Sequence, residues 1–429
     1  MYMTTDYRKM WEDLGINMKK HDQLLAVLPL VYQDVYLTQK NRPQAMEYYD
    51  FVISGIHGIR VKELLDAKDS GKKVVAYFCL YVPEELVIAS NAVLVGLCGG
   101  SNFVDQDAEE VLPRNICPLI KASYGFKVAR ICPYFQAADI CVGETTCDGK
   151  KKMYELLGEL CPVYTVEVPQ KPDTEQAREL FYKEMENLKS KLEELTGHKI
   201  TVQDLKKSIE LVNAKRAVLD KLINTRKASP TPISGKDSLL VSQIAFYDDP
   251  QRFTQKTKEL VEELEKRIKK KEGVVNANAS RIMISGCPMA IPNWKLHHIV
   301  ESSGAVIVVE ESCVGTRFTS MGQIDNSANT VEGLLKAIAD AYLNIHCSCF
   351  TPNSERLKDN VRLAQEFKVD GVIHYSLQTC HGYNIEARKV EKALKEINIP
   401  MLTIETDYSD EDTGQLKTRV EAFLEMLKK

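Results

Sequence analysis

Two short segments place a Thr-Cys pair at the end of an apolar run and directly before an amphipathic helical pattern. The first is GETTCDGKKKMYELL, residues 143–157, and the second is LQTCHGYNIEARKVEKAL, residues 377–394. A thiol at a helix N-terminus meets free backbone N–H groups and the positive end of the helix dipole, and both stabilise the thiolate form. Cys147 and Cys380 are therefore candidate metal ligands.

The cysteine content favours metal binding or catalysis over disulfides. The chain has 12 cysteines and its first residues form no continuous apolar segment of the kind that export signals contain. We therefore expect a cytoplasmic protein, in which thiols stay reduced. Because free cysteine is among the most buried residue types, about half of these thiols are expected to be packed in the core.

Composition bounds the class of protein. A chain of 429 residues is long enough for two or more domains, and its 44% hydrophobic and 27% charged residues are typical of a globular protein. A formal net charge of -4 lacks the basic footprint of nucleic-acid binding. No run of 18 apolar residues occurs, so we expect neither a nucleic-acid nor a membrane partner.

The pattern of apolar residues divides the chain into four parts. Short apolar runs that alternate with helical patterns are typical of parallel α/β sheets, and they occur in residues 71–169 and again in 275–429. Residues 1–70 and 170–274 have helical spacing instead. We predict an α/β fold with two similar, Rossmann-like domains, joined by the helical segment 170–274 and preceded by an N-terminal helical region.

The two predicted domains carry cysteines in the same order after their strands. The expected counterparts are Cys79 and Cys287, Cys98 and Cys313, Cys117 and either Cys347 or Cys349, and Cys147 and Cys380. In a parallel sheet the carboxyl ends of the strands meet at one edge, where ligands bind. The cysteines of both halves are thus expected to face one another across a crevice between the domains.

Zinc and iron–sulfur clusters are the metals that suit such a thiolate-rich site. The chain lacks the two closely spaced cysteine pairs of a zinc knuckle. Cys117 and Cys287 each precede a proline, as in some iron–sulfur ligand runs, but Cys132 and Cys161 do so as well. The spacing alone leaves the choice of metal open.

Four stretches together resemble a known family: YFCLYVPEELVIAS, LPRNICPLIKASYG, ETTCDGKKKMYELL and VDGVIHYSLQTCHGYNIEARKVEKAL. They are similar to the 2-hydroxyacyl-CoA dehydratase and benzoyl-CoA reductase family of iron–sulfur proteins, and the resemblance extends from about Ile56 to the end. Most members of that family resemble subunits with one [4Fe-4S] cluster on three cysteines. The second set here, in ISGCPMA, NIHCSCFTPN and LQTCHGYN, looks like the double-cubane branch, in which a sulfide joins two [4Fe-4S] cubanes into an [8Fe-9S] cluster.

The resemblance implies which cysteines hold the iron. On the N-terminal side they are Cys79, Cys117 and Cys147, and on the other side Cys287, Cys347 and Cys380. Cys349 and Cys313 compete with Cys347 for the middle position. We interpret Cys98, Cys132, Cys141 and Cys161 as packed thiols.

The resemblance also implies a partner. Neither a G-x-x-x-x-G-K-[ST] phosphate loop nor a G-x-G-x-x-G fingerprint occurs, so electrons are expected from another protein. The family pattern implies a homodimeric iron–sulfur ATPase that passes single electrons to this chain, which itself would form a homodimer. Glu84, Glu85, Glu310, Glu311 and His381 adjoin the cysteines, but we expect helix-cap or surface groups there more than acid catalysts.

Three functional hypotheses follow. The leading one is ATP-dependent reduction of small molecules with multiple or N–N bonds at a double cubane in an oxygen-free setting. The second is a subunit of a 2-hydroxyacyl-CoA dehydratase or benzoyl-CoA reductase with a single [4Fe-4S] cluster. The third is a non-catalytic electron-relay protein.

Overall fold

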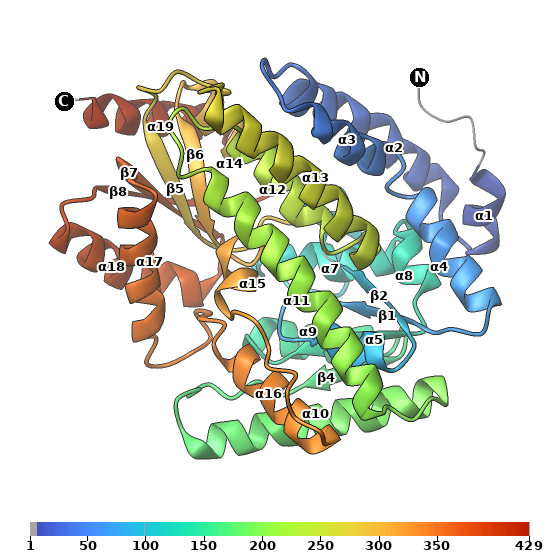
Figure 1. The fold of residues 1–429 in the computed structure, drawn as a ribbon. Coiled ribbons are helices and arrows are strands. Elements are labelled where there is room, and N and C mark those ends of the chain that lie inside the picture. The colour runs from blue at the N-terminus through green and yellow to red at the C-terminus, as the bar shows by residue number, and fades with distance from the viewer. Residues whose placement is uncertain (1–6, 98, 429) are drawn as a thin grey trace.

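The N-terminal part of the chain is helical. In the computed structural model, which describes residues 7–97 and 99–428, α2 and α3 lie side by side on one flank of the molecule (Figure 1). The helices are α1 (Arg8–Asp13), α2 (Met18–Tyr32), α3 (Glu47–Ser54) and α4 (Ile59–Asp69), with a π-helical turn at Gln33–Leu37 and a 3-10 turn at Gln44–Met46. α3 packs against a helix from the middle of the chain, so this region is part of the main body.

The first sheet has four parallel strands in the order β2-β1-β3-β4. The strands are β1 (Val74–Tyr77), β2 (Val93–Gly96), β3 (Ile140–Glu144) and β4 (Val163–Val166). The connecting helices are α5 (Glu84–Ala89), α6 (Asp105–Glu109), α7 (Pro118–Val128), α8 (Pro133–Ala137) and α9 (Asp148–Leu157). Every residue of β1 and β3 is buried, as expected for parallel strands that are covered on both faces.

The second sheet repeats this arrangement with the order β6-β5-β7-β8, again all parallel. Its strands are β5 (Arg281–Gly286), β6 (Val306–Glu311), β7 (Gly371–Leu377) and β8 (Met401–Thr406). Its helices are α14 (Lys295–Ser302), α15 (Thr316–Ser320), α16 (Val331–Leu343), α17 (Ser354–Glu366), α18 (His381–Glu396) and α19 (Thr413–Leu427). The predicted α/β fold with two similar domains is thereby confirmed.

Four helices lie between the two sheets in the chain, and each begins at a residue that favours helix starts. They are α10 (Glu175–Thr196), α11 (Val202–Thr225), α12 (Gly235–Ile244) and α13 (Pro250–Lys269). The side chains of Thr174, Thr201, Ser234 and Asp249 accept hydrogen bonds from the first free N–H groups of these helices. α10 ends at Gly197, whose φ of 71° is left-handed.

Helix α11 ties the two domains together. Figure 1 shows it crossing the molecule diagonally, from the second sheet to the α5 end of the first. Its Lys215 binds the carboxylate of Glu84 at 2.8 Å, and its neighbour Arg216 pairs with Glu85. At the other end, Arg226 Nη1 donates to Glu310 Oε1 over 2.9 Å. Because all of these groups are buried, each cation is matched by a glutamate of one domain or the other.

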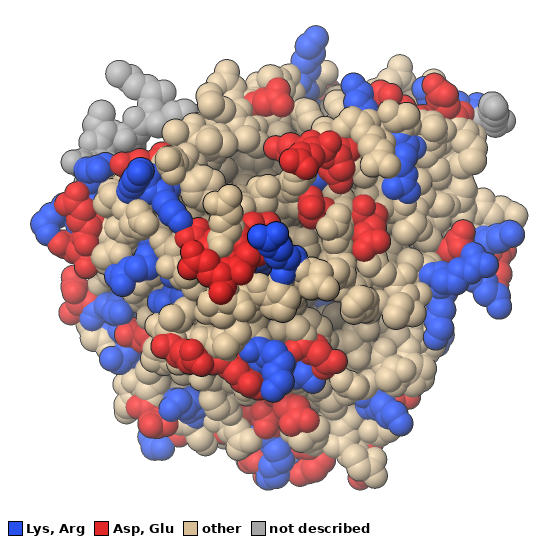
Figure 2. All heavy atoms as spheres, turned by 180° about the vertical axis from the view of Figure 1, so that it is seen from behind, with Lys and Arg blue, Asp and Glu red and all other residues tan. Residues whose placement is uncertain are grey.

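One hydrophobic core runs through both domains. The same cluster of buried side chains includes Val75 of β1, Leu219 of α11 and Ile284 of β5. On the face seen in Figure 2, acidic and basic side chains are interspersed, in keeping with the small net charge of the chain. No helix among the described residues has both the length and the apolar character needed to cross a bilayer.

The buried pair of Glu310 and Arg226 makes stability sensitive to acid. Burial raises the pKa of Glu310, but Arg226 and His297 outweigh burial and lower that pKa from 4.5 to about 2. The pair therefore stabilises the fold at pH values above the pKa that Glu310 has in the unfolded chain. This contribution is lost as pH falls toward about 2. We predict that Glu310→Gln lowers the free energy of unfolding by about 3–5 kcal/mol at neutral pH, because Arg226 is left uncompensated. The deficit should shrink between about pH 5 and pH 2.

Urea denaturation of wild type and variant across this pH range measures the effect. Glu259→Gln is the matched control, because Glu259 and Lys256 form an exposed pair on α13 and such pairs contribute little. A deficit of Glu310→Gln that stays constant from neutral to acid pH would show that the ion pair is not its source.

Candidate metal centre

A cavity of about 550 Å³ lies between the two domains. The six cysteines that the sequence singles out all line it: Cys79, Cys117, Cys147, Cys287, Cys347 and Cys380. Cys313 and Cys349 line it as well. The crevice that the strand order predicts therefore exists, and its wall is rich in thiols from both halves of the chain.

In each sheet, one of these thiols follows the strand that comes first in the chain. Cys79 lies two residues beyond the end of β1, and Cys287 comes directly after β5. Gly286, the last residue of β5, has a φ of 136°, and a Cβ atom there would collide with the backbone carbonyl of Tyr375 in β7. A glycine at this position thus allows the close approach of β5 and β7 that places Cys287 at the cavity.

Three other cavity cysteines stand immediately before helices that begin at the cavity wall. Cys117, Cys147 and Cys380 are the N-cap residues of α7, α9 and α18. The Cys147 sulfur accepts a hydrogen bond from the backbone N–H of Lys150 over 3.4 Å. The positive end of each helix dipole favours negative charge on these sulfurs, but burial outweighs this effect at Cys147 and raises the pKa of its thiol.

Cys117, Cys287 and Cys380 form a group that spans the two domains. Contact with the Cys380 thiol, together with burial, raises the pKa of Cys117 well above its usual range. The pKa of Cys380 is also raised: Cys117 lowers it, but Cys287 and burial raise it more. Neighbouring thiolates repel one another, so these sulfurs ionise together only when a cation neutralises them. A bound metal cluster would supply that positive charge.

A second group forms around Cys347 and Cys349. The Cys349 thiol lowers the pKa of Cys347 to about 6; burial opposes this shift and Arg317 adds to it. The same contact raises the pKa of Cys349 well above its usual range, with burial and nearby Cys79 contributing. Thiols of both domains thus meet in this group too, and the assignment of three ligands to each half stays a prediction.

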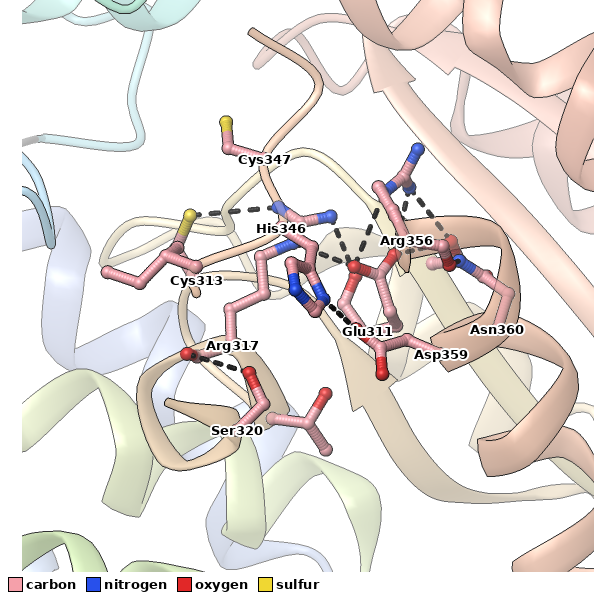
Figure 3. A network of polar contacts seen from close by, with 12 residues as sticks. Glu311, Cys313, Arg317, Ser320, His346, Cys347, Arg356, Asp359 and Asn360 are labelled. Atoms are coloured by element: carbon pink, nitrogen blue, oxygen red, sulfur yellow. Dashed lines mark hydrogen bonds and ion pairs between the residues drawn. The ribbon is translucent and has the colours of Figure 1, made fainter. Parts of the chain in front are cut away.

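Arg317 and Tyr383 are contacts of these thiols that the cysteine pattern does not single out. Arg317 Nη1 lies 3.7 Å from the Cys313 sulfur, and the Tyr383 hydroxyl lies 3.6 Å from the Cys347 sulfur. Figure 3 shows Arg317 between Cys313 and Glu311. The available signal was spacing alone, since Arg317 follows Cys313 by four residues.

The glutamates near the cysteines are neither caps nor surface groups, contrary to expectation. Glu84, Glu85, Glu310 and Glu311 are at most 3% exposed, and each forms an ion pair with a buried lysine or arginine. Their carboxylates therefore balance buried positive charge. His381, in contrast, is exposed and lies at the cavity wall.

The remaining described cysteines lie away from the cavity wall. Cys141 is buried on β3, and its sulfur is 3.9 Å from that of Cys161. Cys132 is the N-cap residue of α8, and burial raises the pKa of its thiol to about 11. Cys98 lies outside the described residues.

The donor set fits an iron–sulfur cluster. Within residues 7–97 and 99–428, no three His, Cys, Asp or Glu side chains are arranged to hold a single metal ion. The cavity thiols come from both domains and lie in two groups, one of Cys117, Cys287 and Cys380 and the other around Cys347 and Cys349. In a four-iron cubane each thiolate binds a different iron, so its ligands surround the cluster from several sides.

The chain matches the model of a known protein family over most of its length. The family model described as 2-hydroxyglutaryl-CoA dehydratase, D-component, matches residues 79–427. The chain therefore belongs to this family, which confirms the resemblance seen in the sequence at that level.

Named relatives match most of the chain. YjiM of Escherichia coli (strain K12), which is named as a candidate dehydratase subunit, is 39% identical over 370 residues, covering 85% of this chain and 94% of YjiM. The (R)-phenyllactyl-CoA dehydratase beta subunit of Clostridium sporogenes is 27% identical, with 84% of this chain and 93% of that protein covered. A benzoyl-CoA reductase subunit of Thauera aromatica is 21% identical, covering 81% and 88% of the two chains.

Proposed function

We propose that this chain is the electron-accepting catalytic component of an ATP-dependent two-component reductase. A double-cubane [8Fe-9S] cluster in the cavity would receive single electrons from a homodimeric iron–sulfur ATPase. The substrates would be small molecules with multiple or N–N bonds. A homodimer of this chain would offer one cavity per protomer to the dimeric partner.

The observation that carries this proposal is the doubled set of cavity cysteines. A single four-iron cubane has room for at most four protein thiolates, one per iron. Cys79, Cys117 and Cys147 reach the cavity from the first domain, and a second set reaches it from the other. The number of cavity thiols therefore exceeds what one cubane binds.

The other wall residues support reductive chemistry. Apolar side chains such as Phe78, Leu97 and Phe246 line much of the cavity, and they exclude water from a reduced site. Lys150 lies in the same wall, where its ammonium group pairs with the buried carboxylate of Glu144. When bound, the cluster would supply low-potential electrons, while these residues surround the substrate and hold it.

The names of the relatives favour a second candidate function. The phenyllactyl-CoA dehydratase and benzoyl-CoA reductase subunits are named for acyl-CoA substrates. On this reading the chain would be part of such an enzyme and would hold a single [4Fe-4S] cluster. The iron content separates the two candidates.

We predict about eight irons per chain, which is the sum expected for two four-iron cubanes. The amount of acid-labile sulfide per chain should be similar. The measurement uses protein that is produced and purified without oxygen. The loaded protein should then reduce small N–N or multiply bonded substrates only when an activating iron–sulfur ATPase and ATP are present. About four irons per chain would favour the single-cluster acyl-CoA candidate. Zinc in place of iron would contradict both.

Single Cys→Ser exchange tests the ligand assignment. Because each predicted ligand binds its own iron, replacing Cys79, Cys117, Cys147, Cys287, Cys347 or Cys380 should remove a large share of the iron. Iron per folded chain, with circular dichroism as a check on folding, is the measurement.

Cys141→Ser is the matched control, because Cys141 is buried outside the cavity and should leave the iron content unchanged. Cys98→Ser and Cys313→Ser should likewise keep most of the iron. If either of them removed as much iron as Cys147→Ser, the assignment would be wrong.

A further inference from the structure

A buried arginine lies beside the thiols of the second group. Arg317 belongs to α15, and its side chain is 2% exposed. Its Nη1 atom is 3.7 Å from the Cys313 sulfur and also donates a hydrogen bond to the Tyr383 hydroxyl (Figure 3 shows the contact with Cys313). The Tyr383 hydroxyl in turn lies 3.6 Å from the Cys347 sulfur. Arg317 is thus linked to two cavity thiols.

The guanidinium group of Arg317 is held firmly from behind. Its Nε donates to Glu311 Oε1 over 2.7 Å, and its Nη2 donates to the Glu311 backbone carbonyl over 3.2 Å. The other oxygen of this carboxylate, Oε2, accepts from Arg356 and from Ser285, both at 2.8 Å. The Glu311 carboxylate is thus shared by two arginines, and Arg356 has a second carboxylate partner in Glu386.

Tyr383 lies against both arginines. The guanidinium carbons of Arg317 and Arg356 are each 5.0 Å from the centre of its ring, a distance at which cations attract aromatic faces. These contacts, together with the hydrogen bond from Arg317, fix the hydroxyl next to Cys347. Removal of the arginine charge would therefore affect the tyrosine and the thiol together.

The first group of thiols has a different environment. Cys117, Cys287 and Cys380 contact one another there, and Lys150 in the same wall pairs with the buried carboxylate of Glu144. The two sides of the cavity thus differ in electrostatics, with Arg317 on the side of Cys347. A fixed positive charge in a low-dielectric site stabilises an added electron nearby.

We infer that Arg317 is a positioning residue for the cluster: it orients Cys347 through Tyr383, and its charge raises the reduction potential of the iron on that side. The inference rests on the proposed function, because it needs a cluster in the cavity. It implies that the first electron delivered to the protein settles beside Arg317.

The test is a redox titration monitored by electron paramagnetic resonance, with iron content measured on the same samples. In Arg317→Gln the midpoint potential of the first reduction should shift to a more negative value than in wild type. Arg317→Lys keeps the charge and should restore most of the potential. Arg226→Gln is the matched control: it removes a buried arginine of the neighbouring Glu310 pair that is outside the cavity wall, and it should leave the potential unchanged.

Two results would overturn the inference. One is full iron content in Arg317→Gln with an unshifted potential, and the other is an equal shift in Arg226→Gln. If Arg317→Gln loses iron, the Glu311→Gln/Arg317→Gln double variant, which keeps the buried charges balanced, takes its place. Iron loss in both of these variants but not in Arg317→Lys supports the positioning role, whereas equal loss in Arg317→Lys and Arg226→Gln overturns it.

Failure of the proposed function is seen separately. A wild-type protein that assembles no iron–sulfur cluster contradicts the proposed function before any variant is compared. A wild-type cluster whose potential does not depend on residue 317 contradicts this inference alone.

Discussion

The parallel direction of the strands is the constraint on which the candidate site depends. Because parallel strands all end at the same edge of a sheet, each domain gathers the residues that follow its strands at one place. Cys79 and Cys147 come after β1 and β3, and Cys287 and Cys380 come after the equivalent strands β5 and β7. Two such edges that face each other produce a cavity with thiols on both sides.

A second constraint keeps the two edges in register. The domains share one hydrophobic core and are bridged by α11, whose buried cations meet Glu84 of α5 in the first domain and Glu310 of β6 in the second. Breaking one such buried pair leaves a charge without a partner, which costs about 3–5 kcal/mol. Paired charges as well as apolar packing therefore hold α11 against both domains.

Much of this architecture could be predicted from the sequence. Alternation of short apolar runs with helical patterns predicts two parallel sheets. The two segments with a Thr-Cys pair predict thiols at the N-termini of α9 and α18, where the structure places Cys147 and Cys380. Both signals are local, since they depend only on neighbouring residues.

Contacts between distant segments could not be predicted in this way. Nothing in the spacing shows that Cys117 meets Cys380, more than 260 residues further along, or that Tyr383 lies between two arginines. The burial of Glu84 and Glu310 was missed for the same reason, because their partners Lys215 and Arg226 come from the separate helix α11. Tertiary packing decides which charges and thiols become neighbours.

Iron-edge anomalous diffraction from crystals grown without oxygen tests the central claim most directly. We predict anomalous density inside the cavity, resolved as two cubanes that contact cysteines of both domains. Iron bound outside the cavity, or bound by the cysteines of one domain only, would contradict it.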